Sequence, residues 1–361
     1  MMLKLGFSEG WVAKVMNCVS TVSFSFVING DVCGSVKPSR GIRQGDPLSP
    51  YLFLLCAEGM SSIINAAVQE SNLSGFQCSQ SGPWISHLFF ADDSLLFSKA
   101  TDRECYTIRH ILETYAAALG QTINYEKSVM CFSRAVNWSE GDRLASLIGV
   151  RHVRCHERYL GLPIFNCRNK KQLFNGIKDR VWSKIKGWKS KTLSVAEKEI
   201  LIKAIIQAIP TYSMGLFRLP KGLIQDLHRL CNRFWWGSSE DRSKLHWCSW
   251  WNMCSSKEER GLGFRDLEVF NRALLTKQGW RLIRNPNSLV GKVLKSCYFS
   301  DSTFMEANPK VKGSLVWEGF LCGVEPLFRW DPDGELERVN LCRFMGIVGF
   351  LVLRLSRLFL R

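Results

Sequence analysis

The chain has 361 residues, enough for two or three domains with cores of their own. Its hydrophobic content of 46% is ordinary for a globular protein and excludes a disordered chain, while its formal net charge of +16 indicates a polyanionic partner, nucleic acid before membrane. The 14 cysteines show no close pairing and no secretory signal is evident. We therefore expect free thiols in an intracellular protein, nuclear or cytoplasmic, without a transmembrane segment.

The first forty residues predict a helix followed by a hairpin. Residues 7–19 carry apolar side chains three and four positions apart, the spacing of an amphipathic helix. β-forming residues over 21–27 and 32–36 flank Asn29-Gly30, the strongest short hairpin signal. We therefore expect two short antiparallel strands after the helix.

A shaped loop comes next. Residues 38–50 hold two glycines and three prolines among basic and amide residues, so the loop exposes its backbone. Asp46 or Ser49 is expected to cap the helix predicted over 48–68. The loop alone fits phosphate binding and a purely structural turn equally well.

Two adjacent carboxylates, Asp92 and Asp93, stand between the short apolar runs 88–90 and 95–97. Each run is rich in aromatic or aliphatic residues and free of proline, so the pattern predicts two strands joined by a tight turn. Carboxylates held at such a tip suit Mg²⁺, which is usually bound by one or two carboxylates together with substrate phosphates. Taken alone, the acidic pair is more typical of ordinary polar turn chemistry.

Helices dominate the remainder of the chain. Apolar spacing predicts helices over 102–119 and 266–284, and two more within 194–235, broken at Pro210 and Pro220. Residues 168–203 carry eleven Lys and Arg against three Asp and Glu. Beside this charge runs an apolar stripe, formed by Leu173, Ile177, Val181, Ile185 and Trp188. The pattern fits a helix along a phosphate backbone and a solvated lysine-rich face equally well.

Two further features concern apolar residues. A core position is expected, rather than a base-stacking surface, for Trp235, Trp236, Trp247, Trp250 and Trp251. The apolar run 344–353 is too short to span a bilayer, which takes about 20 residues. We expect that run to be out-of-frame sequence or a helix packed on the body.

Four sequence blocks, in this order, resemble the palm motifs of reverse transcriptases from plant non-LTR (LINE-type) retrotransposons. They read RQGDPLSP at 43–50, FADD at 90–93, GQTINYEKS at 120–128 and YLGLP at 159–163. Blocks as far as about residue 300 are similar to the segment after the palm, among them FWWG at 234–237 and GLGFRDL at 261–267. The resemblance implies an α+β fold: a partial polymerase right-hand palm, an antiparallel sheet with helices, followed by a mainly α-helical thumb or connection region.

The palm sheet is expected to contain the 89–97 hairpin and strands near 127–133 and 158–163, with the helices 48–68 and 102–119 on one face. The implied domains are a partial palm over 1–165, a basic helical thumb or connection region over 166–300, and a divergent tail over 301–361.

The resemblance also implies residue roles. Asp92 and Asp93 are the implied catalytic carboxylates that bind Mg²⁺, and Lys127 is the implied catalytic lysine beside the triphosphate. The nucleotide and template pocket is implied to include Arg43, Gln44 and Gly45, and the primer grip Tyr159, Leu160 and Gly161. The implied contacts to the nucleic-acid backbone are Lys184, Lys186, Lys189 and Lys191. Without the resemblance, Lys127 could equally be a solvated lysine on a strand, and Tyr159 could equally be a core residue.

The implied partners are an RNA template and a DNA primer, with no membrane and no obligate protein partner. The resemblance also implies a third catalytic aspartate in the two-metal site, carried by a strand that precedes the helix corresponding to 7–19. We expect this chain to lack that aspartate. The first acidic residues here are Glu9 and Asp31, within the predicted helix and hairpin, so neither occupies a strand-borne metal position. We therefore expect a fragment of an RNA-directed DNA polymerase, lacking the fingers and the first catalytic strand and inactive as it stands. The alternative is a non-catalytic nucleic-acid-binding remnant or an unexpressed degenerate reading frame.

Overall fold

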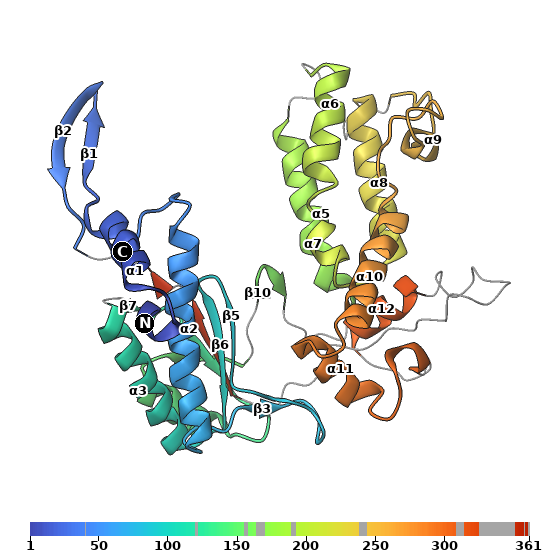
Figure 1. Ribbon diagram of the computed structural model, residues 1–361. Coiled ribbons are helices and arrows are strands. Elements are labelled where there is room, and N and C mark those ends of the chain that lie inside the picture. Colours follow the sequence, from blue (N-terminus) through green and yellow to red (C-terminus); the bar gives the residue numbers. More distant parts are fainter. Residues whose placement is uncertain are drawn as a thin grey trace. The chain divides into compact units, whose positions relative to one another are not determined.

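The computed structural model of the protein describes residues 1–39, 41–119, 122–154, 158–163, 170–188, 193–237, 244–307, 314–324, 351–356 and 358–359. Helices and small sheets make up the first part of the chain and helices most of the remainder (Figure 1), and the expected α+β fold class is confirmed. The chain forms two compact units. The first comprises 1–77, 84–160 and 348–361, and the second 78–83 and 161–347.

The first unit begins with a short 3₁₀ helix (Met2–Leu5), a helix and an exposed hairpin. Helix α1 (Glu9–Ser20) buries only Val15. Strands β1 (Phe24–Ile28) and β2 (Asp31–Val36) pair antiparallel and are exposed throughout. Asn29 and Gly30 have φ angles of 53° and 96°, as a type I′ turn requires, so the predicted hairpin is confirmed.

The main sheet of this unit has the strand order β5-β6-β12-β8-β9. Strands β5 (His87–Phe90) and β6 (Asp93–Ser98) form the predicted hairpin, and β8 (Val129–Cys131) pairs in parallel with β9 (Arg151–His152). Strand β12 (Leu351–Ser356) lies between β6 and β8 and is antiparallel to both. The sheet therefore joins strands from the N-terminal half of the chain to one strand from its C-terminal end, drawn in red in Figure 1.

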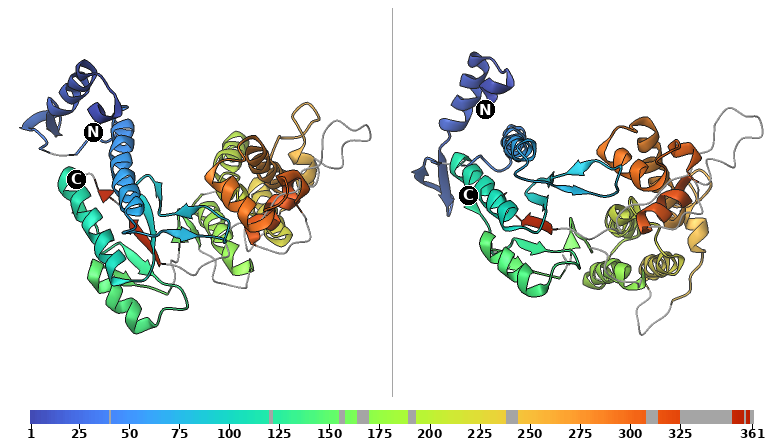
Figure 2. Two further views of the ribbon diagram at one scale, coloured as in Figure 1. Left: turned by 60° about the horizontal axis from the view of Figure 1, so that its bottom comes forward. Right: turned by 90° about the horizontal axis from the view of Figure 1, so that it is seen from below.

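Three helices cover one face of this sheet (Figure 2): α2 (Ser49–Gln69), α3 (Asp102–Leu119) and α4 (Trp138–Ile148). Their contact with the sheet is a hydrophobic core of residues that are at most 2% exposed, among them Ile64, Leu96, Leu112, Met130 and Leu144. Successive strand residues face opposite sides, so Leu96 on the helix-covered face puts Asp93, Leu95 and Phe97 on the other. The expected placement of the helices near 48–68 and 102–119 on one face is confirmed.

Helix α2 combines length with apolar composition. Among the described helices it alone could cross a membrane by these criteria, with 11% of its most apolar window buried. Its C-terminal half contributes Met60, Ile64 and Ala67 to the core, whereas Tyr51 and Leu54 near its start are 68% and 63% exposed.

The expected palm strand near 158–163 is wrong, because it does not join the main sheet. Among the described strands, β10 (Arg158–Tyr159) pairs with β11 (Leu162–Pro163) and with no other. Leu160 and Gly161 have φ angles of 49° and 78°, so the chain reverses in two residues and returns on itself. The remaining short pairs are β3 (Phe76–Gln77) with β4 (Trp84–Ile85), and β7 (Thr122–Ile123) with β13 (Leu358–Phe359).

The second unit is helical and has one core. Its helices are α5 (Lys170–Gly187), α6 (Val195–Leu201), a π-helical turn (Ile202–Ile206), α7 (Thr211–Met214), α8 (Lys221–Trp236), α9 (Trp250–Cys254), α10 (Leu267–Arg284), α11 (Leu289–Tyr298), a 3₁₀ turn (Phe304–Glu306) and α12 (Leu315–Val324). Pro210 and Pro220 stand at the N-caps of α7 and α8, which confirms the predicted breaks. Trp317 of α12 is fully buried, so residues beyond 300 complete this core.

A buried amide ties the turn after α7 to α10. Asn271 is 2% exposed. Its Nδ2 donates to the carbonyl oxygens of Met214 and Phe217 at 2.7 and 2.9 Å, and its Oδ1 accepts the N–H of Leu219 at 2.9 Å. Because a buried polar group is costly without partners, this side chain fixes the chain between two proline-started helices.

The tryptophans divide between core and surface. Trp250 is buried and Trp235 and Trp236 pack against the core, but Trp247 and Trp251 are 79% and 61% exposed. The expected core position is therefore wrong for the last two. Helix α9 has only five residues, and its buried face is taken by Trp250 and Met253, three positions apart, which leaves Trp251 outside.

The C-terminal apolar run also differs from its prediction. Residues 344–350 lie outside the described part of the chain, and from Leu351 onward the segment is a strand rather than a helix. The sequence 351–356 alternates leucine with other residues, a period of two that matches a strand. Every cysteine that the structure describes is a free thiol, as expected.

A buried histidine predicts the pH dependence of the second unit. Burial lowers the pKa of His228 below its ordinary value of 6.5, although Asp266 and Glu268 act in the opposite direction, and its Nε2 accepts the N–H of Leu267 at 3.2 Å. A lowered folded-state pKa stabilises the fold above the ordinary pKa, and this contribution is lost as the pH falls below it. We expect thermal unfolding at lower temperature at pH 5.5 than at pH 7.5, and a smaller difference in His228→Gln. An equal difference in both proteins would contradict the assignment to His228.

Candidate functional site

The acidic pair lies at the tip of the β5–β6 hairpin. Phe90 pairs with Asp93, so Ala91 and Asp92 form a two-residue loop. Ala91 has a φ of 48°, a left-handed conformation that glycine adopts more easily, as at the first position of a type II′ turn. Asp92 is exposed and Asp93, the first residue of β6, is half-buried. The predicted tight turn at the two carboxylates is confirmed.

Lys127 lies at the same end of the sheet as this tip. It stands two residues before β8, and its N–H donates to Oδ1 of Asn124 at 3.0 Å. In the sheet, Ser356 of β12 pairs with Asp93 on one side, and Arg354 pairs with Val129 on the other. Strands β6 and β8 therefore begin at the same end of the sheet, and Lys127 lies in the turn just before β8.

The carboxylates do not assemble a complete divalent-cation site. Among the described residues, no group of three or more His, Cys, Asp and Glu is placed to hold a metal ion. A two-metal clamp holds its ions about 4 Å apart and must surround both. Asp92 and Asp93 are consecutive residues, so they supply one side of such a clamp and the described residues do not supply the other.

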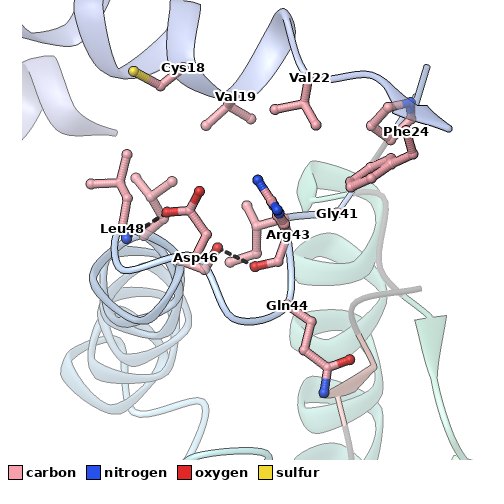
Figure 3. A pocket seen from close by; sticks show the side chains of 13 residues that line it. Cys18, Val19, Val22, Phe24, Gly41, Arg43, Gln44, Asp46 and Leu48 are labelled. Atoms are coloured by element: carbon pink, nitrogen blue, oxygen red, sulfur yellow. Dashed lines mark hydrogen bonds between the residues drawn. The ribbon is translucent and has the colours of Figure 1, made fainter. Parts of the chain in front are cut away.

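A second feature of the first unit is a cavity of about 560 Å³ beside the shaped loop (Figure 3). Its apolar wall comes from the end of α1 and the start of β1, and its polar wall from the loop before α2. The lining residues are Cys18, Val19, Val22, Phe24, Pro38, Gly41, Ile42, Arg43, Gln44, Asp46, Leu48, Ser49 and Leu52. Two of the three residues expected at the nucleotide and template pocket, Arg43 and Gln44, line this cavity, and their role there stays a prediction.

Local hydrogen bonds hold the polar wall. Asp46 Oδ1 accepts the N–H of Leu48 at 2.8 Å, and the Ser49 hydroxyl donates to the carbonyl of Arg43 at 2.6 Å (Figure 3). The N-cap of α2 is Leu48 and has no side-chain cap bond, so the expected cap by Asp46 or Ser49 is wrong, and the two bonds shape the loop before the helix instead. Gly45 has a φ of 83°, which favours glycine, and the space around its α-carbon is open. Arg43 and Gln44 are exposed and point to opposite sides of the loop in Figure 3.

The remaining predicted site residues belong to other parts of the chain. Tyr159, Leu160 and Gly161 form the β10–β11 turn described above. Lys184 and Lys186 are exposed on α5, whose opposite face buries Phe174, Ile177 and Val181. Lys189 and Lys191 lie outside the described residues. The amphipathic character of α5 is confirmed, and contact of its lysines with nucleic acid stays a prediction.

Sequence reasoning missed two parts of this region. The sequence around Val19 and Val22 predicted a helix and a strand, but it did not predict that these residues form the apolar wall of a cavity. The insertion of β12 beside Asp93 was also missed, although the period-two spacing of leucines in 351–356 was a usable signal.

Comparison with known proteins gives one family for the N-terminal half. Residues 3–164 match the family model of the reverse transcriptase, an RNA-dependent DNA polymerase. This range contains the cavity loop, the acidic hairpin tip and Lys127.

Relatives extend the comparison. A putative ribonuclease H protein of Arabidopsis thaliana is 37% identical over 183 residues, covering 48% of this chain and 29% of the relative. An uncharacterized mitochondrial protein of the same plant is 43% identical over 123 residues, covering 34% of this chain and 80% of the relative. A retrovirus-related Pol polyprotein from a type-1 retrotransposable element R2 of Popillia japonica is 27% identical over 128 residues, covering 35% of this chain and 20% of the relative.

The chain thus spans less than a third of the length of the first and third of these relatives and most of the second. The family match, the plant relatives and the retrotransposon polyprotein agree with the motif order in the sequence. The chain belongs to the reverse transcriptase family, as a part of a reverse transcriptase of the non-LTR retrotransposon type.

Proposed function

We propose that the chain binds an RNA template with its DNA primer, as a reverse transcriptase does, but does not polymerise DNA on its own. The observation that carries this proposal is the incomplete carboxylate site. Asp92 and Asp93 stand at the predicted turn, but the described residues place no third carboxylate, histidine or cysteine with them. The described residues therefore offer groups that can bind a nucleic acid but only part of a metal site.

The cavity supports the binding half of the proposal. Apolar side chains such as Val19 and Phe24 form one wall and the polar residues Arg43 and Gln44 another. A nucleotide has an apolar ring face and polar edges with a phosphate, so such a cavity fits its mixed surface. Arginine is well suited to phosphate because its guanidinium presents several donors in one plane.

The second part of the proposal, that the chain does not polymerise DNA, follows from the metal chemistry of the family. Divalent cations, when bound, stabilise the attacking and leaving oxygens of an in-line displacement. The part of this that the chain supplies is a pair of adjacent carboxylates, one exposed and one half-buried, with Lys127 at the same end of the sheet. Such a pair is expected to hold Mg²⁺ only weakly, because this ion needs six oxygen ligands in near-ideal geometry.

The positive charge of the chain also favours binding of nucleic acid. The net charge of +16 and the exposed Lys184 and Lys186 on α5 favour a polyanion. An intracellular location, in the nucleus or cytoplasm, is part of the same proposal, because template and primer are found there.

The binding proposal predicts a strong salt dependence. Each lysine or arginine that neutralises a phosphate releases condensed counterions, so affinity falls steeply as salt is added. We expect the affinity for an RNA–DNA primer-template to fall about tenfold or more between 50 and 200 mM salt. Fluorescence anisotropy with a labelled duplex measures it, and equal affinities at both concentrations would rule out binding through phosphate contacts.

The location of binding is tested by matched charge changes. Arg43→Ala and the double variant Lys184→Ala with Lys186→Ala are expected to weaken binding several-fold. Arg284→Ala removes one positive charge, as Arg43→Ala does, from an exposed position at the end of α10 and serves as the control for Arg43→Ala. If Arg284→Ala weakens binding as much as Arg43→Ala, binding follows net charge rather than the cavity, as in the alternative of a non-specific remnant.

A further inference from the structure

One short stretch of the second unit exposes large apolar side chains. Leu245, Trp247 and Trp251 are each at least 61% exposed, although they belong to the single segment 245–251. The opposite side of this stretch is in the core, because Trp250 and Met253 of α9 are buried there. Single apolar residues scattered over a surface are ordinary, whereas large ones gathered in so short a stretch indicate an interaction surface.

Ring contacts hold this stretch along the C-terminal half of α8. The Trp251 ring lies edge-on to the ring of His228 in the middle of the helix, with centroids 6.2 Å apart. The His246 ring stacks on Trp236 at the last turn of the helix, with centroids 6.1 Å apart. An α-helix rises about 1.5 Å per residue, so these two contacts lie about 12 Å apart along α8. Trp247 follows His246 directly and therefore lies beside the same half of the helix.

Two ammonium groups converge at the end of α8 where His246 stacks. A Cβ built on Gly237, the C-cap of α8, would lie 3.4 Å from Lys244 Nζ and 3.8 Å from Lys198 Nζ. Burial lowers the pKa of Lys198, and the positive charge of Lys244 lowers it further. The carbonyl groups at the end of a helix attract cations. Two like charges so close together are stabilised further by an anion that contacts both.

We propose that a strip along α8, formed by Lys198, Lys244, Trp247 and Trp251, binds single-stranded nucleic acid. Phosphates of the strand contact the two lysines, and unpaired bases stack on the two tryptophans. Every base has a flat face that stacks on an aromatic ring, and surfaces that bind single strands combine such rings with positive charge. The net charge of +16 favours this partner over a second copy of the chain, which would carry the same charge.

This inference rests on the proposed function in taking nucleic acid as the partner. It goes further in giving the second unit a surface of its own for unpaired bases, separate from the cavity beside Arg43. Duplex regions keep their bases stacked on one another, so only an unpaired part of a strand can use the two tryptophans.

The stacking is tested with a labelled oligoadenylate RNA of about 12 nucleotides, within the usual site size for such strands. Fluorescence anisotropy measures the affinity. We expect Trp247→Ala and Trp251→Ala each to weaken binding at least about fivefold, the lower limit for one stacked base. Trp247→Phe keeps an aromatic ring and should recover most of the affinity. Trp84→Ala removes a tryptophan of similar exposure, 57%, from β4 in the first unit and serves as the control.

An abasic strand of the same length separates stacking from charge, because it has the same phosphates and no bases. The natural chain and both alanine variants should bind it equally weakly. The double variant Lys198→Gln with Lys244→Gln should weaken binding of both strands. Its control is Lys292→Gln with Lys295→Gln, which removes two charges from exposed positions on α11 and should have the smaller effect.

Two results would overturn the proposal. One is an affinity for oligoadenylate that is the same in the natural chain, Trp247→Ala and Trp251→Ala. The other is a dimer of the natural chain that becomes a monomer in Trp247→Ala, measured by sedimentation velocity, because a second copy would then cover the strip.

A blunt RNA–DNA duplex distinguishes this proposal from the proposed function. It has no unpaired bases, so Trp247→Ala and Trp251→Ala should bind it as the natural chain does. A natural chain that binds oligoadenylate through the tryptophans but binds no duplex would contradict the proposed function and support the strip.

Discussion

Purified protein is expected to incorporate no deoxynucleotides into a DNA primer on a poly-A RNA template, with either Mg²⁺ or Mn²⁺. Stabilising phosphoryl transfer requires two metals about 4 Å apart that contact the attacking and leaving oxygens. Asp92 and Asp93 are consecutive residues at one hairpin tip, and the described residues complete no metal cluster around them. Enzymes of this kind gain most of their rate from such positioning and charge stabilisation, so its loss removes activity rather than reducing it several-fold.

The control for this result is the Asp92→Ala variant with binding measured in parallel. Both proteins should bind the primer-template and both should give no extension product. Template-dependent incorporation that disappears in Asp92→Ala would show that another carboxylate completes the site, and the proposal of an inactive chain would be wrong.

Replacing Asn271 with leucine is expected to unfold the second unit or to lower its stability by about 4 kcal/mol. The change removes three buried hydrogen bonds, one to the carbonyl oxygen of Met214 at the end of α7, one to that of Phe217 after it, and one from the N–H of Leu219. A buried group that loses its partner costs about 1–3 kcal/mol, and the three groups lie in one turn. Urea unfolding followed by circular dichroism measures the loss.

Asn287→Ala is the matched control, because Asn287 is exposed and lies just after the same helix. That variant should remain within about 0.5 kcal/mol of the natural chain. If Asn271→Leu were equally mild, the turn between α7 and α8 would be held by its apolar contacts, and the amide would have no structural role.

Much of the local structure followed from the sequence for identifiable reasons. Asn29-Gly30 fixed a hairpin because both residues accept positive φ, and Pro210 and Pro220 fixed helix starts because proline lacks an N–H. The acidic tip was predicted because two short apolar runs around a polar pair leave few alternatives. The roles of Arg43, Gln44 and Lys127 came from the order of sequence motifs, and these roles stay predictions.

What the sequence by itself determined are the local elements and the family, since each depends on residues close together in the chain. The tertiary structure alone decided which strands meet. The segment 158–163 turned back on itself, while 351–356 entered the sheet beside Asp93, more than 250 positions away in the sequence. Periodicity shows that a segment can form a strand, but not which partner it has. That choice depends on the buried surface left by β6, β8 and the helices above them, which exists only once the chain has folded.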